Sequence, residues 1–254
     1  MGAYDSAERV SQEVQNNYLF QRSIKAYHEA AGLISGKVLE IGTGSGYGVE
    51  LISGVADEFV TVDKFDTKID FSKYPNVQFV QCNVPPLNFE ANTFDNAITF
   101  QVVEHIKDDH AFIREIHRVL KPGGKLIITT PNIKMSITRN PWHVREYTVD
   151  QFKRLLSTYF SKVESKGVYG NAKSDAYYEN NKKSVQKVLR WDILQMNRWL
   201  PRQILQIPYD IMNKRNRKKL MEQDTDLANS FTPEDFSVKA ADDKCFDLFF
   251  IATK

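Results

Sequence analysis

The stretch Val38-Leu39-Glu40-Ile41-Gly42-Thr43-Gly44-Ser45-Gly46-Tyr47-Gly48 decides the fold that we expect of this chain. Its first four residues form a short apolar run around one acid, which predicts a buried strand. The residues that follow, Gly48 to Ile52, begin an apolar pattern at helical spacing. A strand that runs through glycines into a helix presents backbone N–H groups and a helix N-terminus to a bound ligand. Glycine suits this turn because a Cβ would hold the ligand away and would penalise a positive φ.

The spacing of these glycines distinguishes two kinds of nucleotide site. A dinucleotide site needs G-x-G-x-x-G, but Tyr47 stands where its third glycine would fall. The spacing here is G-x-G-x-G, with Glu40 two residues ahead of Gly42. This pattern resembles the first motif, E/D-x-G-x-G-x-G, of the class I S-adenosylmethionine-dependent methyltransferases. In that family the acid ends the first strand, and the glycine turn passes beneath the amino-acid end of the cofactor.

Composition and length limit the number of domains and the classes of protein that fit this chain. The 254 residues allow one large domain, or one domain with a sizeable insertion. No run of 18 apolar residues occurs, so we expect no membrane span, and the N-terminus has no apolar signal core. Cys82 and Cys245 are far apart in apolar runs, which favours free thiols in a reducing cytoplasm. No Cys or His spacing is typical of a metal site, so we expect no metal.

Four further segments carry the resemblance. The apolar run 58–64 contains Asp63, an acid placed to accept hydrogen bonds from both ribose hydroxyls of a nucleotide. The run 76–84 contains Asn83 where the family usually has an aspartate that binds adenine, and an amide oxygen can accept the same bond. Gln101-Val102-Val103-Glu104-His105-Ile106 after the run 93–100 resembles the family's V-x-E-H-I/V, and Arg118 to Leu126 matches R-x-L-K-P-G-G-x-L.

Strands alternate with helical patterns through most of the chain. This predicts an α/β fold: a doubly wound, mostly parallel, seven-stranded sheet that is Rossmann-like. The resemblance implies that the last strand lies antiparallel between the fifth and the sixth. We expect strands at 38–41, 58–64, 76–84, 93–100, 125–130, 160–168 and 245–253, and helices at 108–120 and 148–159.

Three regions follow from this reading. Residues 1–35 are a helical N-terminal segment over the cofactor site, with a helix over 7–35. Residues 36–169 and 232–254 form the methyltransferase core, and 170–231 form a basic helical insertion before the last strand. The helix over 7–35 either packs on the sheet or, as the resemblance implies, closes over the cofactor with Tyr18 and Arg22 turned inward.

The segment 182–219 is strongly basic. Eleven Lys and Arg residues stand against Asp192 and Asp210, a formal charge of +9, so the rest of the chain carries −7 within a total of +2. Large apolar residues interleave with the basic ones, and we expect Pro201 and Pro208 to break the stretch into short helices. One interpretation is a cap whose basic side is solvated. Another is contact with an anionic membrane or with a lipid-linked or phosphorylated substrate. Nucleic acid is less favoured because the patch belongs to no recognisable binding module.

The resemblance also implies a cofactor and its contacts. S-adenosylmethionine, with S-adenosylhomocysteine as product, would be bound by Glu40, Gly42, Thr43, Gly44, Ser45, Gly46, Asp63, Lys64, Asn83, Val84, Gln101 and Val102. The pattern does not indicate an oligomeric state.

Methyl transfer to oxygen also needs a base, and histidine is the first candidate. His143 lies in a loop, 140–148, that follows the fifth strand and opens on the cofactor crevice. Its stretch, H-x-R-E-Y-T, resembles one found in family members of unassigned substrate. His143 is therefore either a base or substrate contact, or part of a polar network with Arg145 and Glu146. Trp142, Arg145 and Tyr18 are candidate substrate contacts, and His105 more simply orders its loop.

The function that the sequence favours is S-adenosylmethionine-dependent methyl transfer, by O-methylation, to a small-molecule, sugar or lipid-linked acceptor. The tetrapeptide N/D-P-P-Y/F, which marks amino-group methylation, is absent after the fourth strand. The alternative is a protein that binds S-adenosylmethionine, or a partner subunit, without transferase activity of its own.

Overall fold

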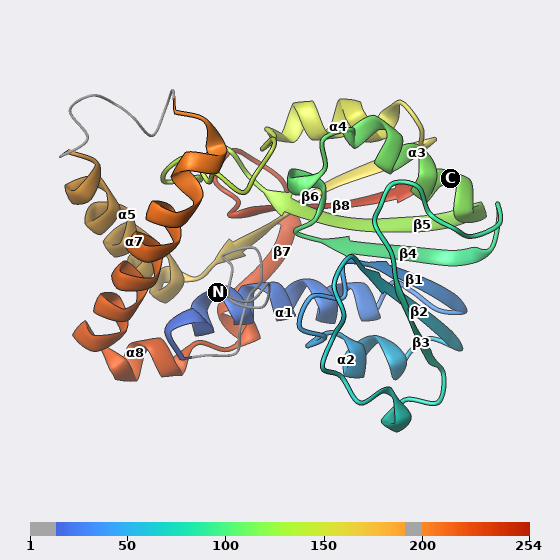
Figure 1. Ribbon diagram of the computed structural model, residues 1–254, viewed down its shortest axis with the longest axis horizontal. Coiled ribbons are helices and arrows are strands. Elements are labelled where there is room, and N and C mark those ends of the chain that lie inside the picture. Colours follow the sequence, from blue (N-terminus) through green and yellow to red (C-terminus); the bar gives the residue numbers. More distant parts are fainter. Residues whose placement is uncertain (1–13, 191–199) are drawn as a thin grey trace.

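The computed structural model describes residues 14–190 and 200–254. They form three layers, with a central sheet between two pairs of helices (Figure 1). Helices α3 (Asp109–Val119) and α4 (Val149–Ser157) cover one face, and α1 (Asn17–Ala31) and α2 (Val49–Ser53) cover the other. The fold is therefore the doubly wound α/β architecture that the alternating pattern predicts.

The sheet has the strand order β3-β2-β1-β4-β5-β8-β6-β7. The pairs among β3, β2, β1, β4 and β5 are parallel, whereas β8 is antiparallel to both β5 and β6. The expected antiparallel insertion of the last strand is thus confirmed. The strands are β1 Lys37–Ile41, β2 Glu58–Asp63, β3 Val77–Gln81, β4 Phe94–Phe100, β5 Leu120–Pro131, β6 Lys162–Gly170, β7 Phe236–Ala240 and β8 Asp247–Thr253.

The eighth strand is the one difference from the expected seven. β7 pairs with β6 on one side only and therefore forms the edge of the sheet. Its sequence, Phe-Ser-Val-Lys-Ala, buries only Phe236 fully. An edge strand with one solvated face lacks the apolar run that makes a central strand visible in a sequence.

Alternating side chains divide the core between the two faces. Leu39 and Ile41 of β1 pack under α3 and α4, whereas Val38 packs against α1 and α2. β8 is buried along nearly its whole length, which is why it is apolar at successive positions. The helices begin as expected: the Asp108 side chain caps α3, and Thr148 with Gln151 forms the capping box of α4.

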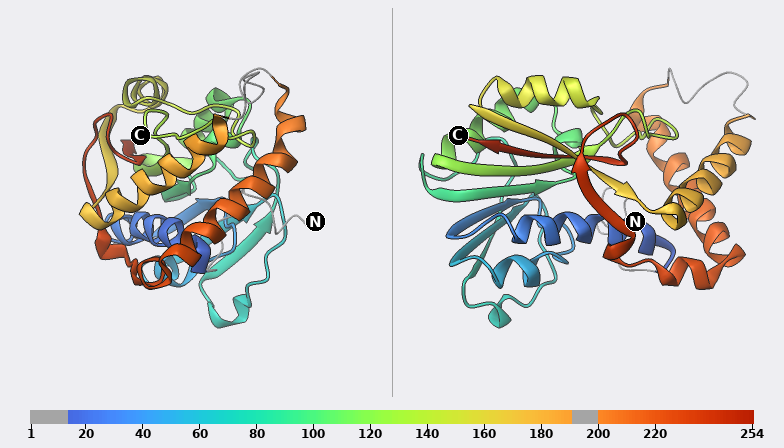
Figure 2. Two further views of the ribbon diagram at one scale, coloured as in Figure 1. Left: turned by 90° about the vertical axis from the view of Figure 1, so that its left-hand side faces the viewer. Right: turned by 180° about the vertical axis from the view of Figure 1, so that it is seen from behind.

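Three helices lie beyond the carboxyl ends of the parallel strands: α5 (Ala172–Leu189), α7 (Arg202–Gln223) and α8 (Thr225–Ser230). Figures 1 and 2 show them as a separate layer beside the sheet, and we call them the cap. The expectation that prolines divide this segment into short helices is wrong for Pro208, which lies inside α7. One missing backbone hydrogen bond is offset here by the packing of α7 on α5 and on the N-terminal turn η1 (Val14–Asn16).

Parts of two expected elements lie outside the described residues: the start of the helix 7–35 and the basic segment at 191–199. Within the described residues, α1 is joined to β8 by an ion pair of 2.8 Å between Arg22 Nε and Asp247 Oδ2. The remaining short helices are η2 Phe71–Lys73, η3 Val103–His105 and η4 Pro233–Asp235. None of the helices that the structure describes combines the length and apolar character needed to cross a bilayer.

Candidate active site

The glycine turn after β1 forms the floor of the site. The N–H groups of Gly42 and Thr43 both donate to the carbonyl of Val62, at 2.8 and 3.1 Å, which fixes the turn against β2. Gly44 has φ +58°, and a Cβ built on it would meet no atom within 4 Å. Gly44 therefore turns an open backbone surface toward the neighbouring cavity, which a ligand can approach closely.

Asp63, at the end of β2, is held by that turn. Its Oδ2 accepts from the N–H of Gly44 at 2.8 Å, and its Oδ1 accepts from the N–H of Phe65 at 2.9 Å. The carboxylate is half-buried at the wall of the cavity. The acid and the glycine turn thus form one unit, as expected where a nucleotide fold binds a ribose.

A cavity of about 500 Å³ lies at this end of the sheet. Among the residues proposed for the cofactor, its lining includes Gly42, Thr43, Gly44, Ser45, Asp63, Lys64, Asn83, Val84, Gln101 and Val102. Phe65, Pro85 and His105 also line it but were not anticipated. Phe65 could have been suspected, because it is two residues beyond Asp63 at the end of an inner strand.

Two residues of the proposed cofactor set do not line this cavity. Glu40 is 1% exposed and accepts hydrogen bonds from the hydroxyl groups of Tyr27, at 2.6 Å, and Thr61, at 2.5 Å. Burial raises the pKa of Glu40 to about 7, against the lowering effect of both hydroxyl groups. Gly46 is packed beneath the side chain of Ile69. Both residues therefore support the turn from behind in this structure.

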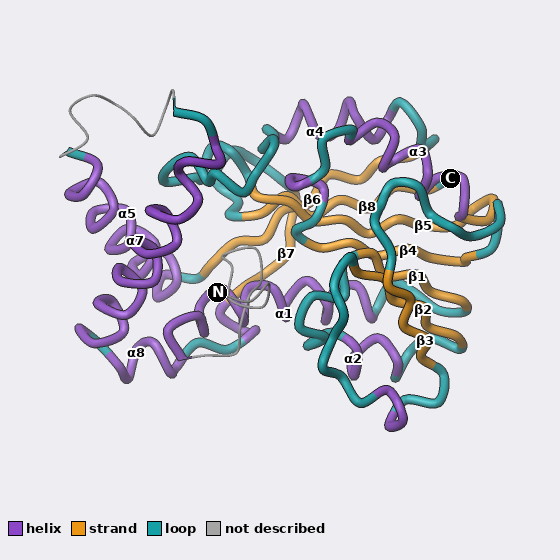
Figure 3. Tube along the Cα trace, in the orientation of Figure 1, coloured by secondary structure: helices purple, strands orange, loops and turns teal. Residues whose placement is uncertain are grey.

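A second cavity, of about 400 Å³, lies between the sheet and the cap. Its lining comes from α1, from the ends of β4 and β5, from the loop after β5, and from α5 and α7. Figure 3 shows the loop after β5 between the sheet and the cap helices α5 and α7. Gln101 and His105 line both cavities, so the two spaces adjoin at the carboxyl end of β4. Gln101 has φ +57°, which is rare for a residue with a side chain and is typical of functional sites.

His143 lies in the wall of the second cavity within a chain of hydrogen bonds. The Oδ1 of Asn140 accepts from the backbone N–H of Trp142 at 3.0 Å, so its Nδ2 faces the Nε2 of His143, at 2.8 Å. The amide must donate there, which assigns the ring proton of His143 to Nδ1. Nδ1 donates in turn to Glu146 at 2.6 Å, and the other oxygen of Glu146 accepts from the hydroxyl group of Ser136.

Glu104, His105 and His143 converge on one place. One possible ligand atom from each lies within 4.8 Å of the others. The sequence spacing did not suggest this group, which tertiary packing assembles from two loops. Such donors could hold a divalent cation, but each also has a protein contact that accounts for its position. Nδ1 of His105 donates to the Trp142 carbonyl at 3.0 Å, and Thr130 donates to Glu104 at 3.0 Å. Burial raises the pKa of Glu104 to about 7.

The three proposed substrate contacts lie in different places. Tyr18 lines the second cavity, where its ring stacks on Tyr177 at 4.7 Å between centroids. Trp142 and Arg145 line neither cavity. The indole N–H of Trp142 donates to Asp210 of α7 at 2.9 Å, and Arg145 pairs with Asp109 of α3 at 2.9 Å. In this structure these two residues anchor the loop, one to the cap and one to the core.

Together the two cavities can hold two molecules end to end. The first offers backbone donors and a carboxylate, which suit a nucleoside with an amino-acid arm. The second offers aromatic and aliphatic walls with a histidine–carboxylate pair near the junction. This arrangement can bring a group on the first molecule against a hydroxyl on the second, and can shield both from water.

Sequence comparisons agree with this geometry. The profile of a family described as "Methyltransferase domain" matches residues 39–128. A probable S-adenosylmethionine-dependent methyltransferase of Mycobacterium tuberculosis is 38% identical over 148 residues, which are 55% of this chain and 54% of that protein. A ubiquinone biosynthesis O-methyltransferase of Rattus norvegicus is 31% identical over 116 residues, 41% of this chain and 34% of that protein. The chain thus spans about half the length of the mycobacterial relative.

A comparison with solved structures concerns the fold alone. A methyltransferase of Thermotoga maritima, described as dependent on S-adenosylmethionine and as a possible histamine N-methyltransferase, superposes with a TM-score of 0.57. The superposition covers 94% of this chain and 91% of that chain at 13% identity.

Proposed function

We propose that this chain, which belongs to the class I S-adenosylmethionine-dependent methyltransferases, transfers a methyl group from S-adenosylmethionine to a hydroxyl of a small-molecule, sugar or lipid-linked acceptor. The observation that carries the proposal is the pair of adjoining cavities. One contains the glycine turn and Asp63, the other contains His143, and Gln101 and His105 lie between them.

The first cavity fits the cofactor. The open backbone at Gly44 lies beside Asp63, the group proposed to bind the ribose hydroxyls. Asn83 and Val84 follow β3 at the place proposed for the adenine, and Gln101 lies toward the second cavity. When bound, S-adenosylmethionine supplies a methyl group on a cationic sulfur, which leaves as a neutral thioether. Glu40 would act indirectly, by holding Thr61 and Tyr27 behind the turn.

The second cavity is proposed to hold the acceptor, with its hydroxyl beside His143. The lone pair on Nε2 now accepts from the Asn140 amide, and an acceptor hydroxyl would replace that donor. Nε2 would then take the proton of that hydroxyl, so that the acceptor oxygen could bond to the methyl group that the cofactor would supply. Glu146 holds Nδ1–H and stabilises the imidazolium that forms.

Calorimetry tests cofactor binding directly. S-adenosylmethionine and S-adenosylhomocysteine should bind the full chain, whereas NAD should not. Asp63→Ala should weaken S-adenosylhomocysteine binding at least about tenfold, because it removes the carboxylate that positions Gly44 and accepts from the ribose. Asp57→Ala is the matched control: Asp57 is exposed at the opposite end of β2 and should leave binding unchanged. Equal losses in both variants would contradict the proposal.

A labelled methyl donor tests the activity. A screen of hydroxyl-bearing acceptors should give product with the wild-type chain. With any acceptor found, His143→Asn should lower turnover about 100-fold or more while S-adenosylhomocysteine binding stays normal. His110→Asn, on the exposed side of α3, is the control. If the cofactor binds and no acceptor class is methylated, the alternative of a binding protein or partner subunit is favoured.

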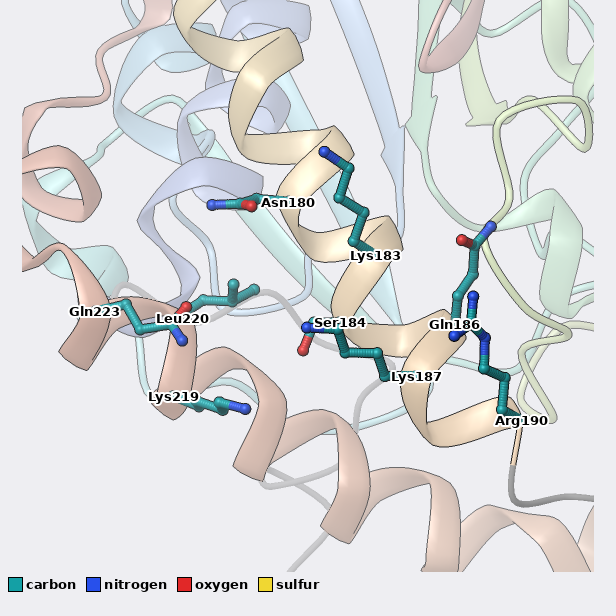
Figure 4. A pocket seen from close by; sticks show the side chains of 9 residues that line it. All are labelled: Asn180, Lys183, Ser184, Gln186, Lys187, Arg190, Lys219, Leu220 and Gln223. Atoms are coloured by element: carbon teal, nitrogen blue, oxygen red, sulfur yellow. The ribbon is translucent and has the colours of Figure 1, made fainter.

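The cap is proposed to rest on an anionic membrane surface or to face a lipid-linked substrate. Figure 4 shows Lys183 and Lys187 of α5, Arg190 directly after α5, and Lys219 of α7 around a hollow of about 270 Å³, which has no acidic residue in its lining. On α7, Ile204, Ile207 and Ile211 are exposed at helical spacing. Cations beside an apolar stripe are typical of a surface that contacts anionic lipid.

The other assignments remain proposals of the same kind. We propose residues 1–35 as an N-terminal segment over the cofactor site, residues 36–169 and 232–254 as the methyltransferase core, and 170–231 as a basic insertion that caps it. Cys82 and Cys245 are both free, and burial raises the pKa of the Cys245 thiol to about 11. Unreactive free thiols fit the proposed cytoplasmic location.

A further inference from the structure

Arg217 differs from the other basic residues of α7. Lys214, Arg215, Lys218 and Lys219 are exposed, whereas Arg217 is half-buried and lines the second cavity. Among the described residues, it forms one hydrogen bond, from Nη1 to the Oδ1 of Asn16, at 2.7 Å. Burial lowers the pKa of its guanidinium. A guanidinium has five N–H donors, so most of its hydrogen-bonding capacity is available to a ligand in the cavity.

Arg217 also has no ion-pair partner in the described part of the chain. Within residues 14–190 and 200–254, no carboxylate lies within ion-pair distance of its guanidinium. The charge of Asp210, seven residues earlier on α7, favours the charged guanidinium, but Asp210 forms its hydrogen bond with the indole of Trp142. Three other ionisable residues of the cavity wall differ in this respect: Arg22 is paired with Asp247, Glu146 is bonded to His143, and Glu104 accepts from Thr130. A half-buried cation without a partner is costly unless an anion is supplied from outside.

A second group in the same wall lacks a partner. The hydroxyl of Tyr18 is buried, and no described residue accepts a hydrogen bond from it. Tyr18 lines the cavity together with Arg217; Tyr177 lies against its ring, and the guanidinium of Arg22, itself a donor, lies beside it. A phenolic O–H and a guanidinium are both donors; the described residues offer no acceptor to the Tyr18 hydroxyl and one acceptor, Asn16 Oδ1, to Arg217. Both are satisfied together by a ligand group with several acceptor oxygens.

Amides complete the polar part of this wall. Asn181 of α5 and Asn213 and Asn216 of α7 line the cavity, and Ser184 donates to Asn216, which donates to Asn181. These side chains carry no charge that would cancel that of Arg217. The catalytic end of the cavity, at His143, is the end that adjoins Gln101 and His105, in the core. Arg217 belongs to the cap. The second cavity therefore has a hydroxyl-binding end in the core and a cationic end in the cap.

We propose that the acceptor carries a carboxylate or phosphate group, and that Arg217, with the Tyr18 hydroxyl, binds that anion in the cap while the acceptor's hydroxyl lies at His143. The substrate class is then an amphipathic anion, with an apolar body against the tyrosines between the two ends. This inference rests on the proposed function for the role of the site. Anion binding itself can be measured without methyl transfer.

Ligand-observed NMR on the full chain, saturated with S-adenosylhomocysteine, tests the proposal. Benzoate and phenyl phosphate serve as anionic probes, and benzamide is the neutral counterpart of benzoate. We expect at least one anion to bind about tenfold or more tightly than benzamide. Arg217→Met should abolish that preference, a loss of about 10- to 100-fold for one charge-assisted contact. The tighter of the two anions distinguishes a carboxylate acceptor from a phosphorylated one.

Three variants keep the test decisive. Lys214→Met removes an exposed cation three residues away on α7 and should preserve the preference. Asn16→Ala removes the hydrogen bond that Arg217 forms within the described part of the chain but keeps its charge, so it should also preserve the preference. Arg217→Gln should behave as Arg217→Met, and it replaces that variant should the methionine fail to fold.

Several results would overturn the inference. These are benzamide binding as tightly as the anions, a preference that survives Arg217→Met, or an equal loss in Lys214→Met or Asn16→Ala. Displacement of the anions by S-adenosylhomocysteine would place them in the cofactor cavity and would also overturn it. Failure of S-adenosylhomocysteine to bind the wild-type chain would instead contradict the proposed function. The two failures are therefore distinguishable.

Discussion

Glu40, a residue of the first motif, lies behind the glycine turn and does not line the first cavity. Its carboxylate is 1% exposed and is bonded to Tyr27 and Thr61. The sequence places an acid two residues before the glycine turn, and the resemblance implies a cofactor contact. The fold places α1 over that position, so the acid is enclosed by Tyr27 and stabilises the turn from below.

Glu40→Gln should change how stability depends on pH. Burial raises the pKa of Glu40 from 4.5 to about 7. Between these values the folded chain holds a proton that the unfolded chain has lost, so this group makes the protein less stable as pH rises. The variant keeps the hydroxyl contacts and removes this loss. The free energy of unfolding of the variant, relative to that of wild type, should therefore rise by up to ~3 kcal/mol between pH 4.5 and 8, since one pKa unit is about 1.4 kcal/mol.

Urea unfolding of both proteins at pH 5 and at pH 8 provides the measurement. Glu104, whose pKa burial also raises to about 7, is present in both proteins and cancels in the difference. A free-energy difference between variant and wild type that is the same at both pH values would show that Glu40 does not titrate in this range.

Gly44 and Gly123 form a matched pair for testing the glycine turn. Both have positive φ, +58° and +79°, and a Cβ on either would meet no atom within 4 Å. Gly44→Ala and Gly123→Ala should therefore each lower stability by about 1 kcal/mol through backbone strain. Only Gly44 lines the first cavity. Calorimetry should show S-adenosylhomocysteine binding weakened at least about tenfold in Gly44→Ala, and unchanged in Gly123→Ala.

The loop after β5 connects elements that the chain order keeps apart. Trp142 donates to Asp210 of α7, Arg202 of α7 donates to the His143 carbonyl at 3.1 Å, and Tyr178 of α5 donates to the Met135 carbonyl at 2.8 Å. The same loop carries His143. The position of the proposed base is therefore coupled to the position of the cap.

Trp142→Phe should loosen α7 without affecting the first cavity. It leaves the buried carboxylate of Asp210 without its indole donor, which costs about 1–3 kcal/mol. Hydrogen exchange across 202–223 should become faster, while S-adenosylhomocysteine affinity stays the same. Arg145→Met is the control, because it removes a contact of the same loop with Asp109 of α3. If exchange in α7 is as slow in Trp142→Phe as in wild type, the loop does not hold the cap.

The charge of the molecule is divided between its two parts. The segment 182–219 carries +9, and the remainder of the chain carries −7. The cations of α5 and α7 surround the hollow of Figure 4, and the exposed isoleucines lie on the same helix α7. This polarity would turn the cap, and with it the second cavity, toward an anionic surface.

Vesicle sedimentation tests this orientation. The chain should bind vesicles that contain phosphatidylserine, and should bind pure phosphatidylcholine weakly, with binding that falls as salt rises. Replacing Ile204, Ile207 and Ile211 by serine should reduce binding at least about tenfold, because these side chains are 59%, 67% and 47% exposed. Serine at Val55 and Ile133, two exposed large apolar residues outside the cap, is the control. Equal binding to both vesicle types would contradict a membrane-facing cap.

Local patterns accounted for most of the sheet and the first cavity. Strand periodicity, the capping box at Thr148 and the glycine spacing each depend on residues close together in the chain. The carboxyl ends of parallel strands meet at one edge, so Asp63, Asn83 and Gln101 could be expected to lie together. β7 was not predicted because an edge strand has little apolar signal. The helix break predicted at Pro208 was wrong because packing keeps α7 continuous through that residue.

The sequence by itself therefore determined the α/β architecture, the glycine turn and the residues along the cofactor edge, because backbone preference and hydrophobic period act over short distances. Tertiary structure alone decided that Glu40 is enclosed, that Trp142 holds the cap, and that Arg217 faces a cavity shared with His143. The bond between Arg217 and Asn16 spans 201 residues, and that between Trp142 and Asp210 spans 68. Such contacts follow from how helices pack on the sheet, which no local pattern encodes.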